Sequence, residues 1–369
     1  MNLGIGLGVT NYLRVPTVPL DPDAAIAALF ESGEEGAWYD PSDLTTLYQD
    51  AAGTTPVTGT GQPVGLMLDK SKGLTLGSEV VTNGTFDTDS NWDKGTHWTI
   101  SGGVASSVNG SLRNLSQVCL TVGKTYKVSW DQTTSSGNIM VYVGLGFTTP
   151  AITGTGTKTA ICKATTNTTL YFQAQNGFTG TIDNISVREL PGNHATQSTS
   201  TARPTLQTSG GLYYLDFDGV DDYMSLPSIT TSQPFGLFVA AENQTLAIAG
   251  VISGGISGYL GVRYTTDAYW GTFDGAQRLF AITSVGSPDI VALTQDSGIS
   301  YPRINGVDSS SYAANLTSQT WVIFGAFTSG SAQFDGRVYG SVIIEKSLSP
   351  AEVQSTESYL ATKSGVTLP

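Results

Sequence analysis

Apolar and polar residues alternate in short runs along most of the chain from about residue 78 onward. In the segment 125–132, Tyr126, Val128 and Trp130 alternate with polar residues, which is the two-residue period of a strand with one buried face. Runs of this kind are bounded by turns rich in glycine, asparagine, serine and threonine, at spacings typical of a β-sandwich. They also cover 103–108, 115–122, 139–143, 158–164, 168–174, 181–188, 212–217 and 338–344. The pattern predicts an all-β chain.

The clearest local signal is a helix at the C-terminal end. Ser349 suits an N-cap, Pro350 the first helical position, and Glu352 completes a capping box. Gly365 is placed to end the helix. Turn chemistry is equally specific at one hairpin, where the pair Asn305–Gly306 favours a type I′ turn.

A second, shorter helix is predicted near the start. Asp21 is a good N-cap, Pro22 suits the first helical position, and Gly33 suits the C-terminal cap. The segment after it, residues 34–73, looks irregular. Its large apolar side chains would anchor it on a core: Trp38, Tyr39, Leu44, Leu47 and Tyr48.

Residues 1–20 have the pattern of an extended arm. Four apolar residues alternate with glycine or asparagine, which is a strand period with little bulk on the other face: Leu3, Ile5, Leu7 and Val9. Pro16 and Pro19 then restrict the backbone at the C-terminal end of this arm. Such an arm is expected to be buried against something, such as another subunit. The alternative is a frayed terminus.

Composition and charge restrict the partners. The 369 residues include 17 Lys and Arg and 30 Asp and Glu, which gives a net charge of −13. No run of basic residues occurs. A nucleic-acid partner is therefore not expected, because phosphate neutralisation needs a basic surface. No signal peptide or membrane-length apolar run is present, so no membrane insertion is expected. A structural zinc site needs about four Cys or His ligands at close spacing, and the two Cys and two His of this chain are not close to one another in the sequence.

Two stretches resemble the laminin-G-like (concanavalin A-like) jelly roll: GLYYLDFDGVDDYMSLP and GRVYGSVIIEKSLSPAEVQSTESYLATKSGV. The flanking motifs resemble a type common in tailed-bacteriophage virion proteins. They are WYDPSD (38–43), DKS (69–71), GNHATQ (192–197) with RPTL (203–206), and FDGVDDY (217–223). This resemblance implies a structural protein of a phage particle.

In that family the DKS and GNHATQ motifs are nearly contiguous, whereas here residues 74–191 separate them. The intervening segment resembles a galactose-binding-like jelly roll of the carbohydrate-binding-module kind. The stretches that carry this resemblance are VVTNGTFDTDSNWDKGTHWTISGGVA, LTVGKTYKVSWD and GTIDNISVREL.

We therefore expect two jelly-roll β-sandwiches, one inserted in a loop of the other, with an N-terminal arm and short flanking helices. The expected boundaries are an anchoring arm at 1–20, a laminin-G-like domain at 21–73 and 192–369, and an inserted jelly roll at 74–191. Tandem domains are the alternative. They would leave residues 34–73 as a long structureless segment, which loop statistics disfavour.

No catalytic motif stands out, so the chain is not expected to be an enzyme. The E-x-D-x-x-E spacing of concanavalin A-like glycosidases is absent, and Glu242 and Glu345 are isolated. Neither histidine lies in a nucleophile-elbow context. Acidic residues do cluster around Gly219, where we expect Asp side chains to stabilise a turn: Asp216, Asp218, Asp221 and Asp222.

Calcium is the cofactor that the second resemblance implies. In the carbohydrate-binding family an acidic residue after an NGxF motif and an Asp near the last strand often hold a structural Ca²⁺. Asp87 and Asp183 match those places, with Asp87 where Glu is usual. Hard oxygen ligands suit Ca²⁺. The alternative is two solvated carboxylates near strand ends.

Sugar binding would need exposed aromatic side chains as stacking platforms. Trp130 and Trp98 are expected in the core, Trp98 because the resemblance implies a buried Trp there. Trp92, Tyr142 and Tyr171 remain as surface candidates. The alternative for each is packing, since an aromatic side chain on a sandwich is more often buried.

Cys119 and Cys162 lie on two predicted strands of the inserted segment. A bridge is geometrically feasible, but proteins assembled in a bacterial cytoplasm stay reduced. We expect two buried thiols that behave as small hydrophobic side chains.

The resemblances together imply a non-catalytic structural or adhesion protein of a tailed-phage particle, such as a head decoration, head fibre or tail-fibre component. It would assemble in the host cytoplasm, lie on the virion surface as a homo-oligomer, and bind other capsid or tail proteins. Two alternatives stay open. One is a receptor-binding protein for host cell-surface glycans, and the other is a secreted bacterial carbohydrate-active protein.

Overall fold

The computed structural model describes residues 21–145, 147–245, 249–254, 259–264, 268–273, 277–282, 285–314, 318–328 and 331–369. The predicted arm, with Leu3, Ile5, Leu7 and Val9, lies outside these residues. Strands account for 52% of the structure and the described part holds two α-helices, which confirms the all-β sandwich class. Neither helix of that part is long and apolar enough to cross a membrane.

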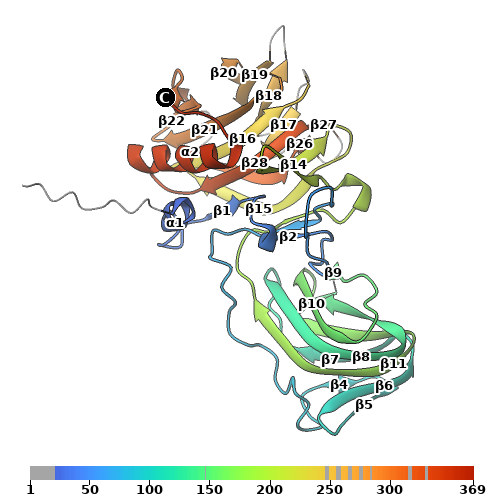
Figure 1. Ribbon diagram of the computed structural model, residues 1–369. Helices are drawn as coiled ribbons and strands as arrows, with labels where there is room; N and C mark the ends of the chain where they lie inside the picture. Colours follow the sequence, from blue (N-terminus) through green and yellow to red (C-terminus); the bar gives the residue numbers. More distant parts are fainter. Residues whose placement is uncertain are drawn as a thin grey trace, which may run out of the picture.

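Two large sheets form the outer sandwich (Figure 1). Sheet A has the order β13-β14-β28-β16-β21-β22-β23, with β1 paired to β28 and β24 to β22. Its strands are β1 (Gly36–Tyr39), β13 (Thr205–Ser209), β14 (Leu212–Asp218), β16 (Phe235–Asn243), β21 (Pro288–Asp296), β22 (Ile299–Ile304), β23 (Val307–Asp308), β24 (Tyr312–Ala313) and β28 (Asp335–Ile344).

Sheet B has the order β2-β3-β12-β15-β25-β17-β18-β19-β20. Its strands are β2 (Leu47–Tyr48), β3 (Leu66–Met67), β12 (Ala195–Thr196), β15 (Met224–Ser232), β17 (Ala249–Ser253), β18 (Tyr259–Tyr264), β19 (Ala268–Phe273), β20 (Gln277–Ile282) and β25 (Ser318–Phe324). A small hairpin pairs β26 (Ala326–Thr328) with β27 (Ser331–Gln333).

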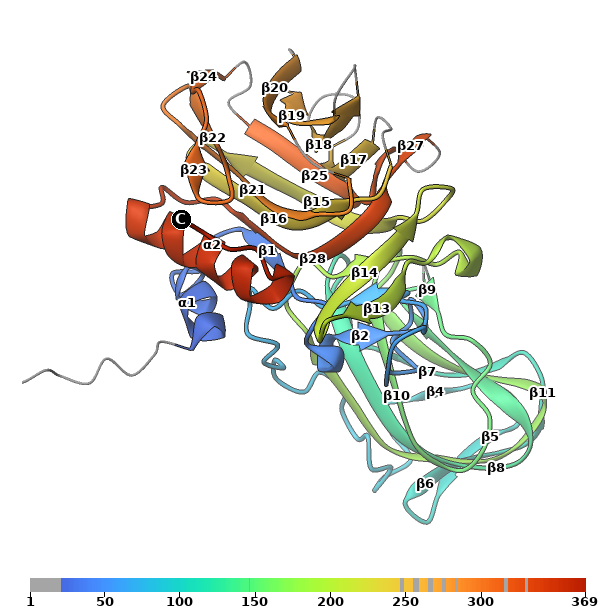
Figure 2. The same ribbon diagram turned by 45° about the horizontal axis from the view of Figure 1, so that its top comes forward.

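The main core of the outer sandwich lies between sheets A and B. Leu237 and Val239 of β16 meet Trp270 of β19 and Trp321 of β25 there, all nearly or fully buried. The opposite face of sheet A is covered by α2 (Pro350–Ser364), with α1 (Pro22–Ala28) beside it (Figure 2). Each large side chain fully buried in this way contributes about 1.5–3 kcal/mol.

Both predicted helices form, and their caps explain their ends. Ser349 and Glu352 make the capping box of α2, and Gly365 ends it in the left-handed region at φ 75°. Asp21 caps α1 by accepting from Asp23 N at 3.1 Å. However, α1 ends at Ala28, and Gly33, predicted as its cap, instead closes a later turn at φ 88°.

Residues 34–73 are largely irregular, as predicted, but they also hold short strands that the sequence did not indicate. The segment contributes β1, all four residues of which are buried. Gly36 is required there, because a Cβ would lie 2.0 Å from Ile343 O on the neighbouring β28. The Asn305–Gly306 turn is confirmed, with φ values of 50° and 81° as a type I′ turn needs.

The inserted sandwich is built from β4 to β11, between β3 and β12 of the outer sandwich. Its strands are β4 (Asp93–Lys94), β5 (Trp98–Ser101), β6 (Val104–Gly110), β7 (Arg113–Val118), β8 (Thr125–Val143), β9 (Phe147–Thr148), β10 (Gly156–Lys163) and β11 (Thr169–Glu189). Its own core holds Trp92, Trp98 and Trp130. The chain therefore leaves sheet B, completes a separate sheet, and returns to sheet B.

Two predicted strand pairs are each a single long strand in the structure. The runs 125–132 and 139–143 both belong to β8, and 168–174 and 181–188 both belong to β11. The pairing between β8 and β11 shifts register between Gln175 and Thr179, which interrupts the regular ladder near the middle of both strands. Gly137 permits the close approach there, since a Cβ at this position would lie 2.4 Å from Phe178 N.

A buried carboxylate joins the two chain segments that connect the outer sandwich to the inserted one. Asp69 Oδ1 accepts from Trp38 N and Ser71 N, each at 2.8 Å, and Oδ2 accepts from Ser71 Oγ at 2.8 Å and Asn193 N at 2.7 Å. Asp69 N donates to His194 Nδ1 at 3.0 Å, across 125 positions of the chain. The DKS and GNHATQ motifs are thus in direct contact, although the whole inserted sandwich separates them in sequence.

His194 completes this junction as a neutral side chain. Burial lowers its pKa, and Nδ1 accepts from Asp69 N, so Nε2 carries the proton and donates to Leu190 O at 3.1 Å. Beside it, Leu66, Leu68, Ile161 and Leu190 form a small apolar cluster between the sandwiches. Ile161 N also donates to Ala52 O at 2.6 Å.

Candidate functional site

The predicted surface tyrosines of the inserted sandwich lie side by side. Tyr142 on β8 and Tyr171 on β11 are directly opposite each other in the strand register. Their strand neighbours Val141, Leu170 and Phe172 are fully buried, so the alternation turns both tyrosines away from the core. Directly opposite residues have Cβ atoms about 4.5–5.5 Å apart. The two half-buried rings therefore share one outer face.

Polar side chains border this tyrosine pair. The Tyr142 hydroxyl donates to Gln173 Oε1 at 3.2 Å, and Gln173 Nε2 donates to Asn114 Oδ1 at 2.9 Å. Ser116 on β7 lies opposite Tyr171. We call these five residues the tyrosine face. It joins aromatic rings to amides and hydroxyls, which suits the apolar faces and hydroxyl edges of a sugar.

The hydroxyl groups of Tyr142 and Tyr171 differ in their hydrogen bonding. The Tyr142 hydroxyl is held by Gln173, whereas the Tyr171 hydroxyl has no hydrogen-bond partner among the described residues. Gln173 and Asn114 were not among the sequence candidates. The signal for Gln173 was its alternation, with Tyr171 and Gln175, with apolar residues in TLYFQAQ.

Trp92 is a correction to the sequence analysis. It is only 6% exposed, and its ring packs against Phe86 and Phe172 with centroids 5.5 and 6.4 Å away. Its Nε1 donates to Asn83 O at 3.0 Å. The polar sequence around Trp92 suggested a surface loop, but the loop folds back and buries the indole. Trp98 and Trp130 lie in the core, as predicted.

The two predicted calcium ligands lie on neighbouring segments. Ile185 N donates to Gly84 O at 2.9 Å, which places the segments of Asp183 and Asp87 side by side. Asp87 is exposed and accepts from Thr85 Oγ1 at 2.8 Å. Asp183 accepts from Asn184 N at 2.6 Å and lies opposite Asp131 in the register. The structure brings the two segments together, and calcium binding by Asp87 and Asp183 stays a prediction.

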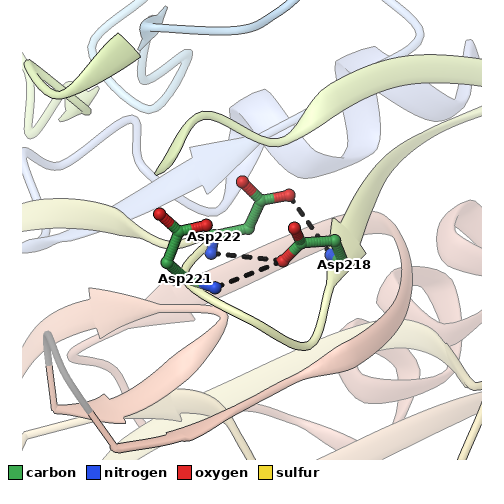
Figure 3. A group of neighbouring side chains, drawn as sticks. All are labelled: Asp218, Asp221 and Asp222. Atoms are coloured by element: carbon green, nitrogen blue, oxygen red, sulfur yellow. Dashed lines mark hydrogen bonds between the residues drawn. The ribbon is translucent and has the colours of Figure 1, made fainter. Parts of the chain in front are cut away.

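The acidic cluster after β14 forms the expected turn (Figure 3). Asp218 Oδ1 accepts from Val220 N at 2.8 Å, Asp221 N at 3.3 Å and Asp222 N at 3.4 Å. Asp222 Oδ2 accepts from Asp218 N at 3.2 Å. Carboxylate oxygens of the three aspartates lie within 4.8 Å of one another. The carboxylates thus hold the turn by accepting its backbone N–H groups.

Burial and the charge of Asp218 raise the pKa of Asp222 to about 7. An acid with a raised folded-state pKa binds its proton more tightly when folded, so stability falls as the pH rises from about 4 to 7. We expect Asp222→Asn to raise the free energy of unfolding by about 1–2 kcal/mol at pH 8 and to leave it unchanged at pH 4, allowing for solvent screening. Chemical denaturation at both pH values measures this.

The exposed neighbour Asp221 supplies the matched control. Asp221→Asn retains the buried carboxyl of Asp222, so its effect at pH 8 should be smaller. An equal gain at pH 4 and pH 8 for Asp222→Asn would contradict the titration of Asp222 as the cause.

The isolated glutamates are held in structural contacts. Glu242 is 4% exposed, with Arg337 Nη1 3.2 Å from its Oε1 and the Tyr339 hydroxyl 2.8 Å from its Oε2. Glu345 Oε2 accepts from Ser232 N at 2.9 Å. Both carboxylates therefore have protein partners, and neither is part of the tyrosine face.

Both cysteines are free thiols. Cys162 is buried opposite Tyr126, and Cys119 is partly buried. Burial raises the pKa of Cys119 to about 12 and that of Cys162 further. Cys162 thus lies in the core of the inserted sandwich as predicted, whereas Cys119, also expected to be buried, is only partly buried and packs against that core.

No protein-family model matches the sequence, and no curated protein matches it. Among solved structures, domain 4 of AbnA, a GH43 extracellular arabinanase from Geobacillus stearothermophilus, is 14% identical with a TM-score of 0.36, over 42% of this chain and 81% of that chain. A Trypanosoma rangeli sialidase in complex with sialic acid is 9% identical with a TM-score of 0.35, over 72% of this chain and 62% of that chain. At such low values, neither likeness bears on what this chain binds.

Proposed function

We propose that this chain is a non-catalytic structural and adhesion protein that binds a saccharide through the tyrosine face of its inserted sandwich. We propose further that it works on the surface of a tailed-phage particle. The observation that carries the binding proposal is the direct opposition of Tyr142 and Tyr171 on an outer sheet face.

The chemistry of the tyrosine face supports a saccharide ligand. Two tyrosines directly opposite each other can offer aromatic contact area to the C–H face of a pyranose, and Tyr residues supply such area at low conformational-entropy cost. The ring of Tyr142 is held in place by its hydrogen bond to Gln173. The Tyr171 hydroxyl, which has no hydrogen-bond partner in the described part of the chain, and the amides nearby can exchange hydrogen bonds with sugar hydroxyls.

The phage setting rests on the sequence motifs. WYDPSD, DKS, GNHATQ and FDGVDDY occur in the order typical of the virion proteins that the chain resembles. In this setting the arm at residues 1–20 would bind capsid or tail proteins, and the chain would act as a homo-oligomer. Host cell-surface glycans would be the ligands of the tyrosine face.

We expect Tyr142→Ala and Tyr171→Ala each to weaken glycan binding about tenfold or more. An aromatic ring that stacks on a ligand is worth about 1–3 kcal/mol, and the middle of that range, about 2 kcal/mol, corresponds to a factor of about 30 in the dissociation constant. Glycan-array binding of the full chain, followed by calorimetry on the strongest ligand, measures the effect.

Tyr301→Ala is the matched control, since Tyr301 is an exposed tyrosine on the outer sandwich. It should leave glycan binding unchanged. Equal loss in Tyr301→Ala, or full binding by both variants of the tyrosine face, would contradict the proposed site. A wild-type chain that binds no glycan would contradict the binding function itself.

The particle setting has its own test in the arm. We expect deletion of residues 2–15 to leave the melting temperature unchanged and to prevent incorporation into phage particles, because Leu3, Ile5 and Leu7 could fill pockets along a partner's sheet edge. Immunoblotting of purified particles measures incorporation. Normal incorporation of the shortened chain would place the anchor elsewhere.

A further inference from the structure

A pocket of about 240 Å³ lies where the inserted sandwich meets the outer one. The inserted sandwich contributes Ile161 and Lys163 from β10, and the outer sandwich contributes Leu66 from β3, His194, and Leu226 and Pro227 from β15. Small-molecule sites are concave, largely apolar and frequent at domain interfaces. This pocket has all three properties.

The walls of the pocket are apolar over most of their extent. Leu66 and Ile161 are 1% and 3% exposed and belong to the apolar cluster between the sandwiches. His194 adds no free hydrogen-bonding group, because Nδ1 accepts from Asp69 N and Nε2 donates to Leu190 O. An apolar body on a ligand would therefore meet matching surface.

Lys163 is the charged group in the lining. It is half-buried, and within the described chain its ammonium has no carboxylate within 4.0 Å and no side-chain hydrogen bond. Its positive charge also helps to lower the pKa of His194, which keeps that ring neutral. In a chain of net charge −13, a cation without an anionic partner at an apolar pocket is complementary to an anionic ligand.

We propose that this pocket binds a small organic carboxylate, with its carboxylate on Lys163 and its apolar body against Leu66, Ile161 and Pro227. The volume sets the size of that ligand. At about 30 Å³ for each water-sized group, the space of about 240 Å³ holds a molecule of roughly eight non-hydrogen atoms. A ligand held by both sandwiches stabilises their junction as well as the fold.

Benzoate and its uncharged isostere benzamide are suitable probes, tested on the full chain at pH 7.5. We expect millimolar benzoate to raise the melting temperature by about 2–4 °C through binding to the native state, and benzamide to leave it unchanged. Lys163→Met keeps most of the apolar stem and removes the charge, so it should lose at least tenfold in benzoate affinity. Lys158→Met, also on β10 but outside the pocket, should bind benzoate as the wild type does.

Chemical-shift mapping on the wild-type chain locates the ligand without a variant. We expect benzoate to move the backbone amide signals of Thr165 and Ser225, which line the pocket from opposite sandwiches. The proposal is overturned if benzoate leaves both signals and the melting temperature unchanged. It is equally overturned if Lys163→Met binds benzoate as tightly as the wild type, or if benzamide binds as tightly as benzoate.

Discussion

Replacing Asp69 with alanine is expected to lower the free energy of unfolding by about 3–5 kcal/mol. The Asp69 side chain is fully buried and accepts four hydrogen bonds, from Trp38 N, Ser71 N, Ser71 Oγ and Asn193 N. Alanine would leave these donors buried without an acceptor. Denaturant unfolding followed by circular dichroism measures the loss.

Two variants define what the carboxylate contributes. Asp69→Asn keeps one acceptor oxygen but points an N–H₂ group at N–H donors, so a smaller loss of about 1–3 kcal/mol is expected. Asp93→Ala removes an exposed carboxylate of the inserted sandwich and should change stability by less than about 0.5 kcal/mol. A loss below about 1 kcal/mol for Asp69→Ala would contradict the role assigned to this junction.

Excision of residues 74–191, with Gly73 joined to Gly192, is expected to leave a cooperatively folding β-sandwich. The outer sandwich keeps its core between sheets A and B and the second core beneath α2. The ends of the excised segment are close together, since Gly77 N donates to Glu189 O at 2.8 Å. Insertions are tolerated where such ends meet at a loop.

The shortened protein should also be less stable than the full chain. Leu66 and Leu68 would lose Ile161 and Leu190 as packing partners, and each such buried side chain contributes about 1.5–3 kcal/mol. Thermal unfolding followed by circular dichroism measures both the cooperativity and the loss. An excised protein that is unfolded while the full chain is folded would show that the outer sandwich depends on the inserted one.

Local signals in the sequence identified the elements whose form depends on near neighbours in the chain. The capping box at Ser349 and Glu352, the type I′ pair Asn305–Gly306 and the alternation around Trp130 each specify their structure within a few residues. Helix ends and tight turns are satisfied by adjacent side chains and backbone angles. These predictions were therefore correct at residue level.

Local sequence signals did not identify the elements whose partners lie far away in the chain. The segment 34–73 looked irregular because β1 has only four residues, and β28 supplies its partner about 300 residues later in the chain, at a separation beyond any local pattern. The polar loop around Trp92 gave no sign that Phe86 and Phe172 would enclose the indole. In both cases the burial of a residue depended on what packed over it.

For the candidate sites, too, some features follow from the sequence and others only from the tertiary structure. The sequence by itself determined the all-β class, the alternation that turns Tyr142 and Tyr171 outward, and the excess of acidic residues that leaves few cations for any ligand. Only the tertiary structure set those two tyrosines opposite each other, brought Lys163 beside Leu66 and Pro227, and joined Asp69 to Asn193. The period of a strand fixes which face a side chain occupies, but strand register and domain contacts fix its neighbours.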